Sequence, residues 1–373
     1  MPTCHAPAGC STQPCSIAFT TRYRDAMQAL PFRRFAGYRA VLAFAIAAGM
    51  AALASPLPAR AGTDGIERPL RRPPSRPLSR PLSGVSAAVC PVSPDTVWVP
   101  AGRFKMGLDS TLPEESQQRE VAVNGFFMDR TEVTNAQFSA FVNATGYRTQ
   151  AERGWAGVKG VPPELQVPGS VVFKAPRSPD VPEYSWWVFT PGADWRHPEG
   201  PGSSLQGRLQ HPVVHVTYDD ALAYARWAGR DLPTEAEWER AARYGKTPNA
   251  MLEPPRNADG TYAANTFQGE FPNRDTGQDG HAGTAPVGCY GADRLGLYDL
   301  LGNVWEWTRD DYRVTGQPTD EPSRILKGGS YLCSEHFCAR YRPAARQPGT
   351  ENLGTSHIGF RTVLRVKSQR PRS

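Results

Sequence analysis

The sequence has an apolar run near its N-terminus, but this run is too short to predict a membrane-spanning helix. That run, Val41–Ala54, is shorter than the roughly 20 residues that a transmembrane helix needs. It follows Arg33, Arg34 and Arg39, and an Ala-Arg-Ala sequence at 59–61 offers a small-residue cleavage site. These features predict a cleaved signal peptide, and therefore a periplasmic or secreted protein without a stable membrane anchor.

The folded part of the chain also lacks an excess of positive charge. The whole chain carries +6, but residues 1–61 carry +5 and residues 62–90 carry +3, so the remainder carries −2. A nucleic-acid partner is therefore not expected. Residues 1–61 are interpreted as an N-terminal extension with the signal peptide, and residues 62–88 as a linker rich in Pro, Arg and Ser.

Cysteine is scarce in the part of the chain that is expected to fold. Of seven cysteines, three precede the predicted signal peptide, which leaves Cys90, Cys289, Cys333 and Cys338. In an exported protein these four allow three disulfide connectivities. A domain of about 280 residues can stabilise itself by its core, so the cysteines are free to serve chemistry. Abundant Gly (35), Pro (36) and Trp (9) indicate a loop-rich α+β domain.

Regular elements are predicted at few places. Capping patterns indicate two helices, one starting at Thr217 and one at Thr234, where Glu237 completes a capping box. Residues 148–210 show no clear periodicity, but they carry several tryptophans, which is typical of loops that build binding surfaces. The predicted elements are a strand within 97–107, a strand and then a helix within 119–147, a strand at Val213–Val216, a helix at Asp219–Ala228 and a helix after Thr234.

Two histidines lack the further ligand that a zinc site needs. His211 and His215 lie four positions apart on the predicted strand, so they are expected to face the same side. No third His or Cys stands near them in the sequence, and zinc needs at least one more protein ligand. Structural roles are therefore expected for both.

Two acidic, glycine-rich stretches have the residue types that Ca²⁺ accepts. In 265–283, Asp275 and Asp279 resemble part of an EF-hand, but the twelfth position is Pro286 instead of Glu. The stretch 296–310 combines acidic and amide side chains with tight turns. A looser oxygen cage is one interpretation, and turn caps with solvated charges are the other.

Cys333 and Cys338 pose the main chemical question. They are five positions apart, so on one straight strand they would face opposite sides, and the chain must turn for them to meet. A local disulfide is the default for an exported protein. A CxxC-type oxidoreductase has shorter spacing, and zinc prefers four ligands. Two thiolates alone suit a soft ion of low coordination number such as Cu(I).

The stretches around these cysteines resemble the formylglycine-generating enzymes, also called sulfatase-modifying factors. The likeness lies in "GNVWEWTRDDY", "ILKGGSYLCSEHFCARYRPAARQ" and "HIGFR", and upstream in "VPAGRFKMG" and "HPVVHVTYDDALAYARWAGRDLPTEAEWE". It extends over about residues 95–366. The resemblance implies one catalytic domain at 89–368 with a short tail at 369–373. Its fold would be α+β, related to the C-type-lectin-like class, with little regular secondary structure.

The resemblance also implies a reaction and its cofactors. Such an enzyme is an oxidoreductase that uses O₂ to convert a cysteine, within a Cys-x-Pro/Ala-x-Arg motif of an unfolded sulfatase or sulfatase-like polypeptide, to Cα-formylglycine. Cys333 and Cys338 would hold Cu(I) as catalytic thiolates, and Ser330 and Trp305 would line the active-site pocket. A monomer is expected. Two structural Ca²⁺ sites are implied, the first at Asn265, Thr266, Asp279 and His281, and the second at Asp299, Gly302, Val304 and Glu306.

Some positions depart from the family pattern. Ser334 and Phe337 stand where members often carry His and Tyr, and His357 stands where Asn is frequent. The alternative interpretation is an exported, non-catalytic binding or assembly module of the same fold, and the presence of both cysteines argues against it. An iron-dependent sulfoxide synthase would need a His-rich helical domain, whereas residues 1–95 hold only His5.

Overall fold

The computed structural model describes residues 96–366 apart from 109–111, 113, 117, 159–160, 179–180, 183 and 314–321. The predicted extension and signal peptide at 1–61, the linker at 62–88, Cys90 and the tail at 369–373 lie outside the described residues. No helix within the described part is long and apolar enough to cross a membrane.

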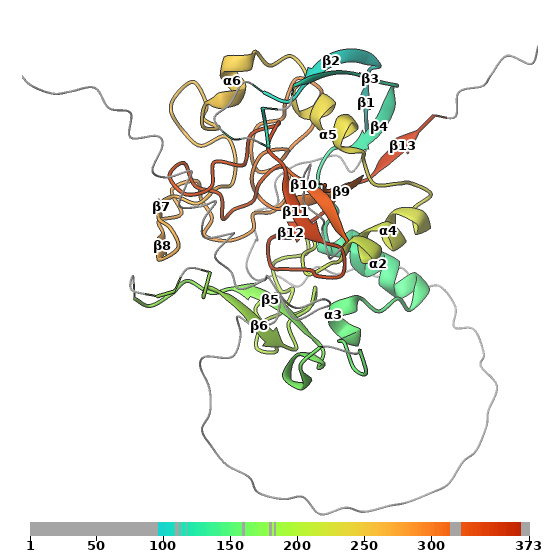
Figure 1. The fold of residues 1–373 in the computed structure, drawn as a ribbon, viewed down its shortest axis with the longest axis vertical. Coiled ribbons are helices and arrows are strands. Elements are labelled where there is room, and N and C mark those ends of the chain that lie inside the picture. Colours follow the sequence, from blue (N-terminus) through green and yellow to red (C-terminus); the bar gives the residue numbers. More distant parts are fainter. Residues whose placement is uncertain are drawn as a thin grey trace, which may run out of the picture.

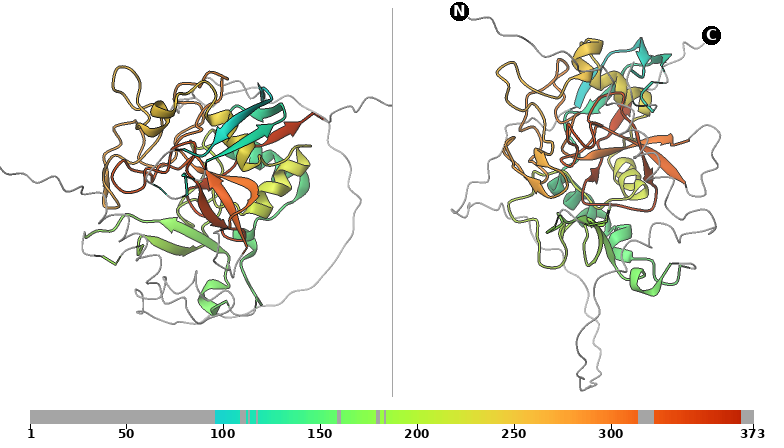
Figure 2. Two further views of the ribbon diagram at one scale, coloured as in Figure 1. Left: turned by 45° about the horizontal axis from the view of Figure 1, so that its top comes forward. Right: turned by 60° about the vertical axis from the view of Figure 1, so that its left-hand side comes forward.

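Two separate sheets and three small hairpins contain all the named strands (Figures 1 and 2). The three-stranded sheet has the order β1 (Thr96–Val99), β4 (Phe126–Asp129), β13 (Val363–Arg365), so the first and last strands flank the same neighbour. The four-stranded sheet has the order β11 (Gln347–Thr350), β10 (Ser323–Lys327), β9 (Trp305–Asp311), β12 (Ile358–Gly359). The hairpins are β2 (Gly102–Met106) with β3 (Arg119–Val123), β5 (Gly169–Phe173) with β6 (Trp187–Pro191), and β7 (Gly269–Glu270) with β8 (Arg274–Asp275).

The helices begin where the local sequence satisfies their first N–H groups. Four of them start with a capping box formed by a threonine and the side chain three residues later, as predicted for Thr234 and Glu237. The helices are α2 (Asn135–Thr145), α3 (Gln150–Arg153), α4 (Tyr218–Trp227), α5 (Glu235–Ala242) and α6 (Pro248–Leu252), with a 3₁₀ turn at Pro163–Leu165.

Three predictions of local structure were wrong in detail. The predicted strand within 97–107 is two strands, because β1 pairs with β4 and β2 pairs with β3. The predicted strand Val213–Val216 does not form. Val213 N–H donates to Val133 and His215 N–H donates to Thr355, so no single neighbour offers a ladder. The region 148–210 is not all loop, since it contains α3 and the β5–β6 hairpin.

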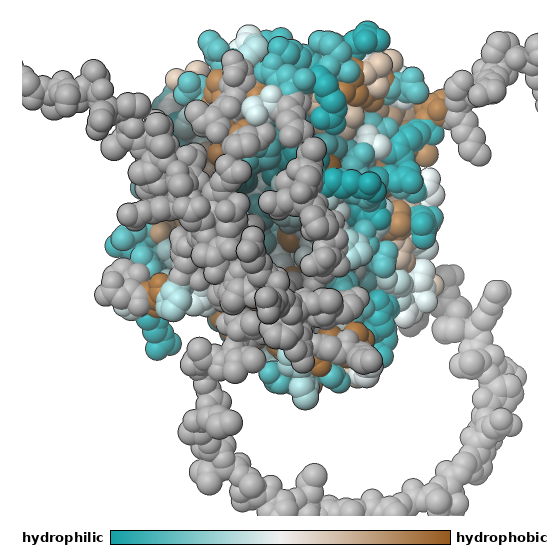
Figure 3. All heavy atoms as spheres, in the orientation of Figure 1, coloured by the Kyte–Doolittle hydropathy of each residue, from teal (hydrophilic) through white to brown (hydrophobic). Residues whose placement is uncertain are grey.

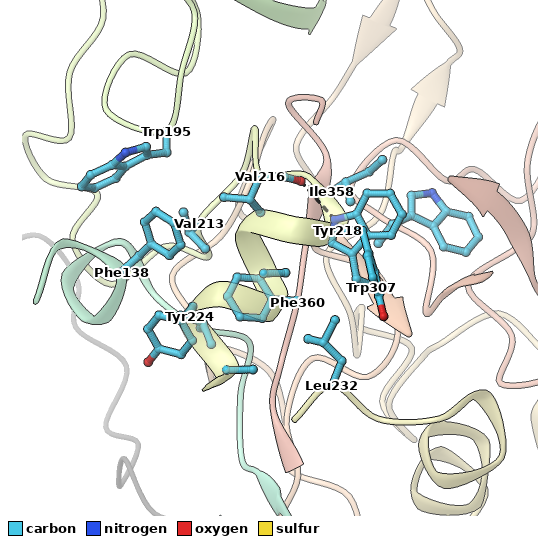
Figure 4. Packing of buried hydrophobic residues seen from close by; sticks show 14 of the residues in the cluster. Phe138, Trp195, Val213, Val216, Tyr218, Tyr224, Leu232, Trp307, Ile358 and Phe360 are labelled. Atoms are coloured by element: carbon cyan, nitrogen blue, oxygen red, sulfur yellow. Dashed lines mark hydrogen bonds between the residues drawn. The ribbon is translucent and has the colours of Figure 1, made fainter. Parts of the chain in front are cut away.

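Two apolar clusters form most of the core. The larger one joins α2, α4 and β9, and Figure 4 shows Phe138 and Tyr224 packed beside Phe360. Buried Trp305 and Cys333 belong to this same cluster. The smaller one places Trp238 of α5 against the three-stranded sheet. The coloured face in Figure 3 is mostly hydrophilic, with apolar residues scattered over it.

Candidate functional site

The structure brings Cys333 and Cys338 together as free thiols. Their Sγ atoms are 3.5 Å apart, well beyond the roughly 2.05 Å of a disulfide bond. The chain turns between them, as predicted, and Cys338 N–H donates to the Ser334 carbonyl at 3.2 Å. Cys333 is buried and Cys338 is partly exposed. The local disulfide considered from the sequence is thus not formed in this structure.

The two thiols differ in acidity. A hydrogen bond from Cys333 and the guanidinium of Arg340 lower the pKa of Cys338 to about 6. Burial, together with the neighbouring sulfur, raises the pKa of Cys333 above its usual range. At neutral pH the pair therefore consists of a thiolate on Cys338 beside a thiol on Cys333.

Ion pairs tether the chain that follows Cys338. Arg340 contacts the Glu114 carboxylate at 2.7 Å, and Arg342 contacts that of Glu115 at 3.1 Å. The arginine side chains are largely buried, and Glu115 is almost completely so. Both glutamates lie between β2 and β3, so a distant segment helps to place the cysteine turn.

Ser330 and Trp305, the predicted pocket residues, lie next to the cysteine turn. Ser330 is fully buried, its carbonyl accepts from Cys333 N–H at 2.9 Å, and its hydroxyl accepts from Leu332 N–H. Trp305 of β9 packs in the same cluster as Cys333, and the backbone N–H of Trp305 donates to the His357 carbonyl. The structure thus gathers all four predicted catalytic residues, while their roles stay predictions.

A group of aromatic side chains beside the cysteines was missed at the level of sequence. Phe337 stacks on Phe271 with ring centroids 4.2 Å apart, and Trp186 meets both rings edge to face. Trp187 lies over His357 at 4.6 Å. The tryptophans of 148–210 were the available signal, since they indicated a binding surface. Nothing in the sequence pattern singled out Phe271.

The residues of the first predicted calcium site lie together in one loop. The Asp279 carboxylate accepts from the N–H groups of Thr266 at 2.8 Å and His281 at 3.0 Å. The Gln268 amide donates to both the Thr266 carbonyl and the Asp279 carboxylate, so these two oxygens converge on one point. Asn265 Oδ1 is buried and accepts no hydrogen bond. Converging oxygens and an orphaned amide oxygen fit the donor chemistry of Ca²⁺. Gln268 was not predicted.

At the second predicted calcium site, the carboxylates already accept hydrogen bonds from other residues. Both oxygens of Glu306 accept hydrogen bonds from Arg361 at 2.7–2.9 Å, and one also accepts from the Trp238 indole at 2.7 Å. The carboxylate is therefore occupied. Asp299 accepts from Gly288 N–H at 2.6 Å, and burial raises its pKa to about 6.

At that second site, the backbone at Gly302 passes very close to the backbone at Asn265. Gly302 has φ +80°, and a Cβ on it would lie 2.1 Å from the Asn265 carbonyl oxygen. Val304 is fully buried. Across the described ranges, no group of three or more His, Cys, Asp or Glu side chains is placed to hold a metal ion.

The histidines His211 and His215 do not share a face, contrary to the prediction, because His215 has φ +60° and no strand forms. His215 is fully buried between the Ser170 hydroxyl and the Pro198 carbonyl, both at 2.8 Å, and burial lowers its pKa to about 4. The His211 ring contacts the Thr284 hydroxyl at 3.0 Å. These hydrogen bonds give both rings structural partners.

Cys289 is disulfide-bonded.

Comparisons with known proteins agree with this geometry. The family model described as "Sulfatase-modifying factor enzyme 1-like domain" matches residues 85–366. A protein of Mycobacterium tuberculosis named formylglycine-generating enzyme is 45% identical over 292 residues, covering 72% of this chain and 97% of its own. The mouse protein of that name is 42% identical, covering 70% of this chain and 73% of its own.

The family also contains members without activity. A mouse protein named inactive C-alpha-formylglycine-generating enzyme 2 is 39% identical, covering 72% of this chain and 85% of its own. Among solved structures, PvdO from Pseudomonas aeruginosa matches with a TM-score of 0.51 and 24% identity over 73% of this chain and 95% of its own, which supports the fold alone. The chain therefore belongs to the sulfatase-modifying factor family, which includes the proteins named formylglycine-generating enzymes.

Proposed function

We propose that the protein converts a cysteine of a sulfatase or sulfatase-like polypeptide to Cα-formylglycine. The observation that carries the proposal is the pair of free thiols 3.5 Å apart, in a chain 45% identical to a protein named formylglycine-generating enzyme. A structural disulfide would have left no ligand for a metal. Two sulfurs with one thiolate already formed are a donor set that suits Cu(I).

Within this proposal the side chains have distinct tasks. Cys338, already acidic, and Cys333, which loses its proton on metal binding, would hold Cu(I). The bound ion would supply the activation of O₂. The partial exposure of Cys338 leaves a side from which the substrate cysteine approaches. Buried Trp305 and Ser330 would exclude water and keep the turn in place.

Cations and location follow as further parts of the proposal. A structural Ca²⁺ would be held by Asn265, Thr266, Asp279 and His281. Asp279 would offer its side-chain carboxylate, and His281 its backbone carbonyl. A second structural Ca²⁺ would lie at Asp299, Gly302, Val304 and Glu306, where the Glu306 carboxylate would be shared with Arg361 and Trp238. The protein would act after export as a monomer on an unfolded polypeptide, with O₂ as the oxidant.

The test uses purified protein loaded with Cu(I) in air and the peptide Leu-Cys-Thr-Pro-Ser-Arg. Conversion of the CH₂–SH group to an aldehyde lowers the peptide mass by about 18 Da. The shift is expected with the wild type and absent with Cys333→Ser and Cys338→Ser. Copper binding is measured separately by chelator competition. Bound copper without conversion of this or related Cys-x-Pro/Ala-x-Arg peptides would instead favour the non-catalytic binding module.

A further inference from the structure

The cysteine turn has no regular secondary structure of its own. Residues 331–342 contain neither helix nor strand, and within the turn the backbone closes with the bond from Cys338 N–H to the Ser334 carbonyl. A single weak bond of this kind does not hold two sulfur atoms at a set separation. The spacing of Cys333 and Cys338 therefore depends on contacts from other segments.

One segment contacts both ends of this turn. Phe267 N–H donates to the Cys333 carbonyl at 2.9 Å, which holds the first cysteine. Four residues later, the Phe271 ring stacks on Phe337, the residue directly before Cys338, with centroids 4.2 Å apart and planes at 17°. The stretch 267–271 therefore spans the two cysteines from outside the turn.

Phe271 is itself held by other aromatic rings. Its centroid lies 5.1 Å from that of Phe267, 5.7 Å from Trp186 and 5.9 Å from Phe173. The last two belong to the β5–β6 hairpin region, which lies beside β7–β8 in Figures 1 and 2. Phe271 itself lies in the turn of the β7–β8 hairpin, and its ring packs against the β5–β6 region and the cysteine turn, so it has little freedom to shift.

We propose that Phe271 is a positioning residue which, through its stack on Phe337, keeps Cys338 apart from Cys333 and ready to share a soft metal ion with it. Closing a disulfide requires the sulfurs to approach from 3.5 Å to about 2.05 Å. Phe337 directly precedes Cys338, so its stack on Phe271 restrains the backbone that carries the Cys338 sulfur. The stack therefore opposes the disulfide and favours the separated pair.

The proposal predicts two effects of opposite sign in Phe271→Ala. Cu(I) affinity should fall by between about 3-fold and 10-fold, the range expected for an aromatic stack. The equilibrium constant for forming the Cys333–Cys338 disulfide with oxidised glutathione should rise by a similar factor. In that exchange one S–S bond forms between the two cysteines and the S–S bond of glutathione disulfide breaks, giving two glutathione thiols that take up the proton of Cys333 and one proton from solvent.

Controls separate positioning from general loosening. Phe127→Ala removes a half-buried ring that contacts Trp98 within the three-stranded sheet, away from the cysteine turn, and should leave both constants unchanged. Phe271→Tyr keeps the ring and should restore both. If Phe271→Ala does not fold, Phe337→Leu removes the same stack from the other side and should give the same pair of opposite shifts.

The outcomes decide the matter without the peptide assay. Opposite shifts that Tyr restores support the proposal. Unchanged constants, or a joint fall in both, would overturn it, since general loosening weakens metal binding and disulfide formation together. The copper measurement rests on the proposed function, whereas the glutathione equilibrium does not. A protein that shows the disulfide shift but never converts the peptide would retain the positioning role and lose the proposed function.

Discussion

The pair formed by Glu306 and Arg361 and the pair formed by Cys333 and Cys338 are both buried polar centres, yet they are built differently. Arg361 and Glu306 are fully enclosed, and every oxygen of the carboxylate accepts a hydrogen bond. Glu306 lies in β9 and Arg361 lies two residues after the end of β12, so the adjoining sheet backbone supports both. The sulfurs of the cysteine pair contact each other across 3.5 Å in a turn.

The difference separates a structural centre from a reactive one. A buried charge is tolerated when its partners satisfy it completely, and nothing further can bind there. The thiol pair keeps unused donor capacity, and Cys338 is a partly exposed residue.

The largest expected loss of stability comes from removing one partner of the Glu306–Arg361 pair. Arg361→Met leaves the Glu306 carboxylate buried without its cation, beside buried Glu132 and Asp299. The free energy of unfolding should fall by about 3–5 kcal/mol. Urea unfolding measures it. The control Arg313→Met removes an exposed pair with Asp311 and should cost less than about 1 kcal/mol. Equal losses in the two variants would contradict the comparison.

A smaller effect is expected from a buried neutral group next to the reactive site. Burial lowers the pKa of His357 to about 3, against about 6.5 in the unfolded chain. Below pH 6.5 the unfolded state therefore binds more protons, and stability falls as the pH falls. For this one group the loss between pH 7 and pH 5 is about 2 kcal/mol.

His357→Asn isolates that contribution. The difference between unfolding free energies at pH 7 and pH 5 should shrink by about 2 kcal/mol relative to the wild type. Buried His215 titrates in the same direction in both proteins, so it cancels in this comparison. An unchanged pH difference would mean that the His357 ring accepts a proton in the folded state.

The smallest effect on stability is expected at the reactive centre. Cys338→Ala removes one sulfur from a partly exposed residue and should change the unfolding free energy by about 1 kcal/mol or less. Under the proposed function, peptide conversion should nevertheless fall to background. Urea unfolding and peptide mass are measured on the same preparation. A loss of stability as large as that of Arg361→Met would assign the thiol pair a structural role instead.

Local patterns predicted some of these features well. The helix starts at Thr217 and Thr234 were correct because a capping box is formed within four consecutive residues. The turn between Cys333 and Cys338 was also predicted, since their spacing on a straight strand would separate them. The strand at Val213–Val216 was wrong, because its N–H groups find partners on two unrelated segments.

The sequence by itself determined the family, the helix caps and the residues from which the candidate site is built, because these depend on neighbouring residues and on a characteristic order of motifs. Only the tertiary structure decided that Arg361 occupies Glu306, that Gln268 bridges Thr266 and Asp279, and that Phe271 meets Phe337. Most of these contacts join residues that are far apart in the chain. Which distant charges, hydrogen-bonding groups and aromatic rings come into contact depends on the packing of the whole fold.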